Sequence, residues 1–467
     1  MIDLLLRGRG PRCVAAGAAL LVAAAAALAR PAGVPVVAPP PVPTSAASAP
    51  GEPVEVSAAA RRLYEHARGQ LLQIRTLLKT QDSQASVGSG FIVGNDADGL
   101  RIVTNYHVVS EYALEPERYR LRFATTDGRE GRLELLDVDV RHDLALLRPV
   151  ADDAALLAGR GALAFRPRAN ALDKGDRIYS MGNPHDVAFA VVEGNYNGLV
   201  ERSFDPLIYY AGGINPGMSG GPVLDEQGRV VGVNVSTLLF AQQMSFLVPG
   251  PFAEDLYVRS HAAKPLKLPA WPALRQQLLA YQDELVKAFL AQPWESAGHP
   301  HYRMPVPEQT YMRCWGSGTP TDAKGLEFQR SQCRMEHALY VNGGLQLGYL
   351  DMQHEIYDGG KLGALRFAEA YTASFRNERL GGNSRASTAP YCKEDFVNRG
   401  GLPLRAVICL SAYRKLEGLY ALNVLVTTVD ADTEGALGRF NAYGVSFDNA
   451  LALSRHYLEG FGWTRKP

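Results

Sequence analysis

Residues 214–234 read INPGMSGGPVLDEQGRVVGVN, and the glycine-rich loop within this stretch decides the fold. Ser219 lies in this loop, two residues after Gly217 and directly before two further glycines. An oxyanion hole needs a tight loop in which two backbone N–H groups converge on one point. Glycine allows that conformation and leaves room for a substrate. We therefore expect Ser219 to be a nucleophile, with the N–H groups of Gly217 and Ser219 as oxyanion donors.

A histidine and an aspartate upstream complete a candidate triad. His107 lies in TNYHVV at 104–109, and Asp143 lies in HDLALL at 142–147. A serine hydroxyl is a weak nucleophile unless an imidazole takes its proton and a carboxylate holds that imidazole. The chain order His, Asp, Ser is that of chymotrypsin-type triads and differs from the orders in subtilisins and α/β-hydrolases. A lone histidine or aspartate would more often be structural, but three matches in this order favour catalysis.

Short strand-like runs surround these residues. GSGFIV at 88–93 and RIVTNYHVV at 101–109 are two examples. Leu121 and Phe123 alternate with polar residues, which is the two-residue period of half-buried strands. Many short strands with few helices predict an all-β barrel or sandwich up to about residue 248, preceded by a helix near 55–69.

Six segments of this region follow one another in a recognisable pattern: GSGFIV, TNYHVV, DLALL, MGNP, the 214–234 stretch and SFLVP at 245–249. In order and spacing they resemble the HtrA/Deg-type proteases of the trypsin-like clan, over about residues 55–250. The resemblance implies a double six-stranded β-barrel with the triad in the cleft between the barrels. It assigns His107 as the general base, Asp143 as its orienting partner and Ser219 as the nucleophile.

Two features depart from that family. Met218 stands where the family usually has Asn, and no PDZ-like carboxylate-binding loop is recognisable after residue 250. In digestive members of the clan, an Asp directly before the serine pairs with a newly cut N-terminus. Met218 cannot accept that charge, so we expect no activation of the trypsinogen type.

The resemblance also implies a substrate preference. Proteases of the clan that cut after Lys or Arg carry an Asp six residues before the nucleophile, where this chain has Gly213. Without a carboxylate there, we expect small to medium apolar P1 residues such as Val, Ala or Leu. Further substrate-binding residues, on the family's substrate-pairing strand and the wall of its S1 pocket, are Val235, Ser236, Thr237, Ser245 and Phe246.

The N-terminus predicts export. Arginines precede an uncharged run at 13–29 that ends in the small-x-small pattern Ala27-Leu28-Ala29, so residues 1–29 are either a cleaved signal peptide or an N-terminal membrane anchor. Residues 30–53, rich in Pro and Ala, predict a semi-rigid linker. We expect a periplasmic or otherwise extracytoplasmic protein, soluble or tethered through residues 13–29.

A chain of 467 residues is too long for one core, and the pattern changes near 262–269. We therefore predict a trypsin-like domain at 54–255 and an α+β accessory domain at 265–467. Helical spacing in the accessory domain occurs at 271–292, 361–375 and 446–461, and strand-like runs occur at 404–413 and 419–429.

Four of the five cysteines lie beyond residue 310, and export would place them in an oxidising compartment. Their spacing favours two local disulfides, Cys314 with Cys333 and Cys392 with Cys409, although four cysteines allow three pairings. No C-x-x-C pair occurs, and we interpret His299 and His301 as linker histidines, so we expect no metal and no cofactor. The Tyr-rich C-terminal portion is compatible with core packing or with a peptide- or glycan-binding surface.

Charge excludes one class of partner. Forty-eight Lys and Arg balance forty-eight Asp and Glu, which leaves no net field for nucleic acid, and we expect none as a partner. The sequence favours an exported serine endopeptidase that acts on polypeptides through an acyl-enzyme, in envelope protein quality control or regulated proteolysis. The alternative is a binding or scaffolding protein that acts through its C-terminal domain and carries a vestigial protease fold.

Overall fold

The computed structural model describes residues 56–96, 99–237, 244–296, 299–320, 322–376, 378, 380–429 and 432–464. The predicted leader at 1–29, the linker at 30–53 and Cys13 lie outside the described residues. No helix within the described ranges is long and apolar enough to cross a membrane. Residues 55–467 form one compact unit.

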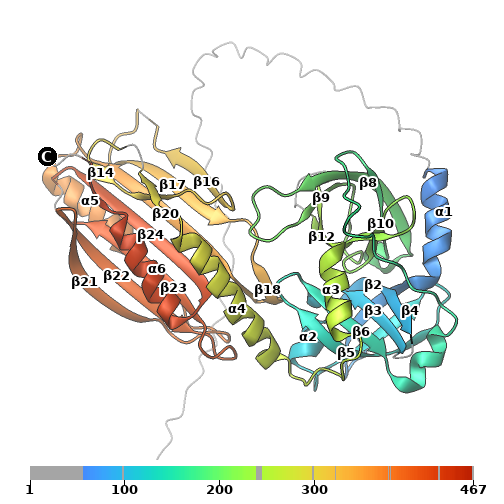
Figure 1. Ribbon diagram of the computed structural model, residues 1–467. Helices are drawn as coiled ribbons and strands as arrows, with labels where there is room; N and C mark the ends of the chain where they lie inside the picture. The colour runs from blue at the N-terminus through green and yellow to red at the C-terminus, as the bar shows by residue number, and fades with distance from the viewer. Residues whose placement is uncertain are drawn as a thin grey trace, which may run out of the picture. The chain divides into compact units, whose positions relative to one another are not determined.

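The first closed barrel contains the histidine and the aspartate of the candidate triad. Its six antiparallel strands are ordered β1-β2-β3-β6-β5-β4 (Figure 1). They are β1 (Leu71–Leu78), β2 (Gln84–Asp96), β3 (Gly99–Thr104), β4 (Tyr119–Thr125), β5 (Glu130–Asp139) and β6 (Leu144–Pro149). Helix α1 (Ala58–Ala67) precedes the barrel, and the Ser57 hydroxyl caps it by accepting the Ala60 N–H at 3.1 Å. Helix α2 (Tyr106–Leu114) follows β3.

The second closed barrel contains Ser219 in the loop between β9 and β10. Its order is β10-β11-β12-β9-β8-β7. The strands are β7 (Arg177–Gly182), β8 (Ala190–Leu199), β9 (Ile208–Ala211), β10 (Pro222–Leu224), β11 (Val230–Thr237) and β12 (Ser245–Pro249). Helix α3 (Gly250–Ser260) packs against β11 and against β5 and β6 of the first barrel. The predicted double six-stranded barrel is thus confirmed.

The C-terminal region is α+β, as predicted. Its antiparallel seven-stranded sheet has the order β16-β17-β20-β24-β23-β22-β21. These strands are β16 (Met312–Gly318), β17 (Glu327–Met335), β20 (Tyr349–Asp358), β24 (Glu434–Val445), β23 (Tyr420–Thr428), β22 (Leu402–Ala412) and β21 (Tyr391–Arg399). Helices α4 (Trp271–Leu290), α5 (Ala364–Arg376) and α6 (Phe447–Glu459) occupy the three predicted helical segments.

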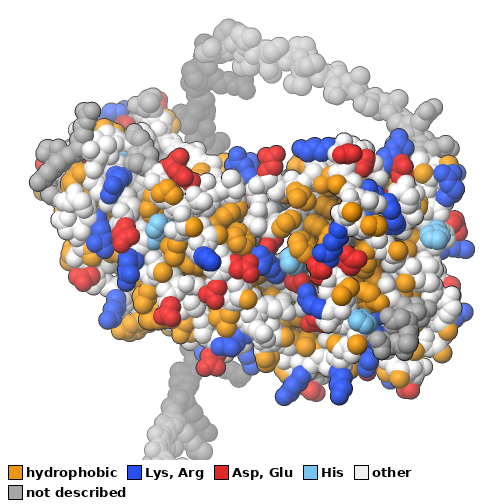
Figure 2. Space-filling view, viewed as in Figure 1, with side chains coloured by type: hydrophobic (Ala, Val, Ile, Leu, Met, Phe, Trp, Pro, Cys, Tyr) orange, Lys and Arg blue, Asp and Glu red, His pale blue; other side chains and the backbone are white. Residues whose placement is uncertain are grey.

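Short elements complete the described chain. Three strand pairs, β13 (Trp294–Ser296) with β15 (Pro305–Pro307), β14 (Tyr302–Arg303) with β25 (Gly462–Trp463) and β18 (Leu339–Asn342) with β19 (Leu345–Leu347), lie outside the large sheet. The 3₁₀ helices are Arg68–Gln70, Ala151–Leu157 and Pro184–Asp186. The face shown in Figure 2 mixes Lys and Arg with Asp and Glu, in keeping with the balanced charge of the chain.

Both disulfides have the predicted local pairing. Cys314 on β16 bonds Cys333 on β17, and Cys392 on β21 bonds Cys409 on β22. Each pair is directly opposite in the register of its two strands. The two bonds therefore fasten both edges of the seven-stranded sheet.

The apolar core continues through the segment where we expect a domain boundary. One cluster joins Leu72 on β1 of the first barrel and Val109 on α2 to Leu274 on α4 and Phe440 on β24. The Leu266 N–H donates to the Leu135 carbonyl at 2.8 Å across the same junction. The division into domains at 54–255 and 265–467 remains a prediction, and we use "C-terminal region" for residues 265–467.

Candidate active site

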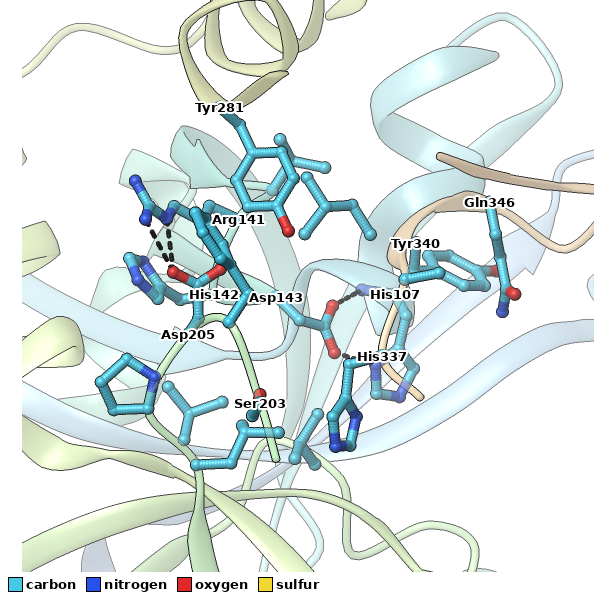
Figure 3. Close-up of a pocket in the computed structure, with 18 of the residues that line it drawn as sticks. His107, Arg141, His142, Asp143, Ser203, Asp205, Tyr281, His337, Tyr340 and Gln346 are labelled. Carbon is cyan, nitrogen blue, oxygen red and sulfur yellow. Dashed lines mark hydrogen bonds and ion pairs between the residues drawn. The ribbon is translucent and has the colours of Figure 1, made fainter. Parts of the chain in front are cut away.

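His107 and Asp143 form a tight pair at the start of α2 (Figure 3). The Nδ1 of His107 lies 2.6 Å from Oδ2 of Asp143, and the His107 backbone N–H donates to Oδ1 at 2.8 Å. The Asp143 carbonyl in turn accepts the Tyr106 N–H at 3.0 Å and the Asn105 Nδ2 at 2.8 Å. The turn between β5 and β6 is thereby fastened to the first turn of α2, and the imidazole is held through Nδ1.

The pair changes the basicity of His107. Burial by itself would lower the pKa of His107, but the charge of Asp143 and its hydrogen bond outweigh burial and raise that pKa above its ordinary value. An imidazole bonded to a carboxylate through Nδ1 keeps Nε2 free to accept a proton. This is the arrangement that a general base requires.

The Ser219 loop has the conformation that its glycines predicted. Gly217 has φ of +96°, and a Cβ there would lie 2.4 Å from the Asn183 carbonyl oxygen, so only glycine fits. The Pro216 carbonyl accepts the His185 N–H at 2.7 Å. Because C=O and N–H point in opposite directions across a trans peptide, the Gly217 N–H faces away from His185. Within the described residues neither the Gly217 N–H nor the Ser219 N–H has a hydrogen-bond partner.

Two buried residues hold this loop, and neither was expected from the sequence to do so. The Ser89 hydroxyl donates to the Gly217 carbonyl at 2.7 Å, and the Ser89 N–H donates to the Ser219 carbonyl at 2.7 Å. From β11, Asn234 Nδ2 donates to the Met218 carbonyl at 3.2 Å. Ser89 lies in the GSGFIV segment, and Asn234 is the last residue of the 214–234 stretch that also contains the loop.

The Ser219 hydroxyl points toward β11. Its Oγ donates to the Val235 carbonyl at 3.4 Å, and among the described residues it has no hydrogen bond to His107. Val235 and His107 line one cavity. The Ser219 carbonyl and Val108 of α2 both lie close to Gly88 of β2, where an added Cβ would meet both of them. Catalytic hydrogen bonds are often formed only when substrate binds. Rotation of the Ser219 side chain about χ1 would turn its hydroxyl away from the Val235 carbonyl.

Of the residues predicted to bind substrate, Gly213 and Ser245 lie next to each other, whereas Phe246 and Val235 have other surroundings. Gly213 has open space where a Cβ would be, and Ser245 borders it by donating to the Gly212 carbonyl at 2.8 Å and accepting the Ile214 N–H at 3.2 Å. Phe246 faces the other side of β12, where its ring contacts His337 at 5.6 Å. Val235 lines the cavity beside His107. The backbones of Ser236 and Thr237 belong to β11, and their side chains lie outside the description.

Met218 is fully buried. Its side chain packs with Ile178, Tyr210 and Val223 in the apolar core of the second barrel. The position therefore supports the Ser219 loop through apolar packing and offers no acceptor for a charge.

Alternation of side chains along a strand would direct His142, next to Asp143 in the sequence, away from the cleft and to the surface, and this expectation from the sequence differs from the structure. Its ring stacks on Phe252 of α3 at 3.8 Å, and its Nδ1 lies 3.0 Å from Asp139 Oδ2. It also lines the cavity beside the triad. The expectation was wrong because it assumed strand alternation, whereas Asp143 lies in a turn with φ of +53°.

The comparisons with known proteins concern the barrel region. Residues 88–233 match the family model of the trypsin-like peptidase domain. Among curated relatives, "Serine protease HTRA1" of Xenopus laevis is 31% identical over 201 residues, which are 41% of this chain and 40% of that protein. "Probable periplasmic serine endoprotease DegP-like" of Hahella chejuensis is 34% identical over 158 residues, covering 33% of this chain and 30% of that protein.

A solved structure, the serine endoprotease from Yersinia pestis, is 21% identical with a TM-score of 0.36, covering 44% of this chain and 67% of that chain. The chain thus spans less than half the length of the two curated relatives described above. The family match and the two curated relatives support a serine endopeptidase of HtrA-like type.

Proposed function

We propose that the protein is an exported serine endopeptidase in which Ser219 is the nucleophile, His107 the general base and Asp143 the group that orients His107. The observation that carries the proposal is the 2.6 Å contact between His107 Nδ1 and Asp143 Oδ2 beside a glycine-rich Ser219 loop. The match of residues 88–233 to a trypsin-like peptidase domain supports it.

The reaction proceeds in two halves. Ser219 Oγ attacks the carbonyl carbon of the scissile bond, and its proton passes to His107 Nε2. The N–H groups of Gly217 and Ser219 stabilise the negative oxygen that forms. The C–N bond then breaks, the leaving amine takes the proton from His107, and an acyl group remains on Ser219. Water, deprotonated by His107, attacks the acyl carbon, the bond from that carbon to Ser219 Oγ breaks, Ser219 Oγ takes the proton back from His107, and the acid product leaves.

Substrates are polypeptides with small to medium apolar P1 residues. Open space at Gly213 and the neutral hydroxyl of Ser245 beside it support this preference, since neither offers a charge to a basic side chain. Because several relatives are named as periplasmic endoproteases, we place the activity outside the cytoplasm, in protein quality control or regulated cleavage.

Hydrolysis by purified protein tests the proposal. The wild type should cleave an unfolded polypeptide such as reduced casein, and Ser219→Ala should lower the rate by several powers of ten. Ser317→Ala, which alters an exposed serine on β16, should retain full activity. Equal rates for the wild type and Ser219→Ala would overturn the assignment and favour the alternative of a binding protein.

A further inference from the structure

A cavity of about 360 Å³ opens beside the candidate triad (Figure 3). His107, Val235 and Tyr281 of α4 line it, together with a wall formed by residues 336–340 beside His107. Residues 336–340 lie outside the 88–233 match to the trypsin-like peptidase domain. This wall is therefore supplied by the part of the chain that the family match does not reach.

Three contacts fix the wall against the barrels. The buried Tyr106 hydroxyl of α2 donates to the Val341 carbonyl of β18 at 2.9 Å. The Tyr340 ring meets the His107 ring edge to face at 5.9 Å, and the His337 ring meets Phe246 at 5.6 Å. Residues 336–340 thus contact both barrels and the general base.

The lining of the cavity is mixed, and it includes a cluster of apolar and aromatic side chains. Phe204 and Tyr281 meet edge to face at 5.6 Å, and Val140, Leu207 and Leu339 line the space around them. Aromatic rings prefer this edge-to-face geometry, and apolar lining favours an apolar guest.

The charged residues around the cavity already have partners. Arg141 pairs with Asp205 at 2.7 Å and with Glu284 at 2.6 Å. Glu336 pairs with Arg313 at 2.8 Å. Burial lowers the pKa of His337, so its ring is neutral at neutral pH. A charged guest would lose water without gaining a free counter-charge, which disfavours it.

The position of the cavity selects which part of a substrate can reach it. A substrate paired in an extended conformation along β11 directs alternate side chains to opposite faces. With the P1 side chain directed toward Gly213, the P2 and P4 side chains face the His107 side, where the cavity opens.

Resting on the proposed endopeptidase function, we propose that this cavity binds an aromatic P2 or P4 side chain of the substrate, and that residues 336–340 of the C-terminal region determine this selectivity. The C-terminal region is then part of the substrate site.

Peptides that differ only in Phe, Gly, Lys or Asp at P2 or P4 test the proposal. We expect kcat/KM for the Phe peptide to exceed that for the Gly peptide at least tenfold in the wild type. Ala338→Phe fills the cavity and should abolish this difference while the Gly peptide is still cleaved. Ala373→Phe, on the exposed face of α5, is the matched control and should keep the preference. His337→Glu should shift the preference from Phe toward Lys. A wild-type preference for Lys or Asp, or an unchanged Phe preference in Ala338→Phe, would overturn the proposal.

A binding measurement separates this proposal from the proposed function. Ser219→Ala protein is titrated with the Phe and Gly peptides, and the Phe peptide should bind at least tenfold more tightly. The additional change Ala338→Phe should remove that difference. Selective binding without hydrolysis in the wild type would contradict the endopeptidase and leave the cavity assignment in place. Hydrolysis without selectivity would contradict the cavity assignment alone.

Discussion

Asp143 acts on His107 in two ways. One carboxylate oxygen accepts the backbone N–H of His107, and the other contacts its ring. The first contact positions the start of α2, and the second fixes the tautomer and raises the pKa of the ring against the effect of burial. The sequence could predict this pair because both residues lie in short recognisable segments. It could not predict the environment of His142, since that depends on the turn at Asp143 and on packing against α3.

Replacing the carboxylate tests this account at a single residue. Asp143→Asn should lower kcat about 10⁴-fold, because the imidazole loses its orientation and its partner charge. The acid limb of the pH–rate profile should also move to lower pH, since burial, which lowers the pKa of His107, is then unopposed. Stopped assays from pH 5 to 9 measure both quantities, with the exposed Asp152→Asn as control. An acid limb that moves upward would contradict the assignment.

The Ser219 loop is ordered by neighbouring elements. Ser89 on β2 and Asn234 on β11 bond its carbonyl groups, and Met218 anchors it in the second barrel. The glycines of the loop were informative in the sequence, because an unusual backbone conformation needs them. The β18–β19 pair was not foreseen, although Asn342-Gly343-Gly344 between apolar runs is a hairpin signal. Its contact with α2 joins residues 235 positions apart, which no local pattern reports.

Because neighbouring elements order this loop, the rate of hydrolysis should not depend on which residue stands at the N-terminus. A newly cut ammonium group at Met218 would be buried without a partner, a state that costs several kcal/mol. Residues 54–467 prepared with several different N-terminal extensions should therefore hydrolyse one peptide at similar rates. Activity that arises only after one particular N-terminus is freed would contradict this expectation.

Across the molecule, one apolar core joins the first barrel to the C-terminal sheet. The α+β class, the three helices and two strands of the sheet, β22 and β23, followed from periodicity, and the disulfides followed from spacing. The other five strands of the sheet were not predicted. The core that connects the region to the barrel was not predictable, because burial between distant segments leaves no periodic signal of its own. The core also contains a buried histidine: His354 Nε2 lies 3.0 Å from the Tyr457 hydroxyl, and burial lowers the pKa of His354 to about 4.

The lowered pKa of His354 makes the free energy of unfolding depend on pH. Between pH about 6.5 and 4 the unfolded chain binds a proton at His354 that the folded protein does not, so the free energy of unfolding falls as pH falls. The contribution is about 3 kcal/mol and levels off below pH 4. The free energy of unfolding, measured with urea at pH 7 and pH 4.5, should fall less for His354→Gln than for the wild type. The exposed His66→Gln is the control, and its free energy of unfolding should fall as much as that of the wild type. The same loss in His354→Gln would exclude this residue as the cause.

The central claim is that Ser219 is the residue that becomes acylated. An organophosphonate probe that reacts with activated serines, followed by peptide mass spectrometry, measures this directly. The account predicts one labelled site at Ser219 in the wild type, weak labelling in His107→Ala, and none in Ser219→Ala. Labelling that persists at full level in Ser219→Ala, or that maps to a different serine in the wild type, would contradict it.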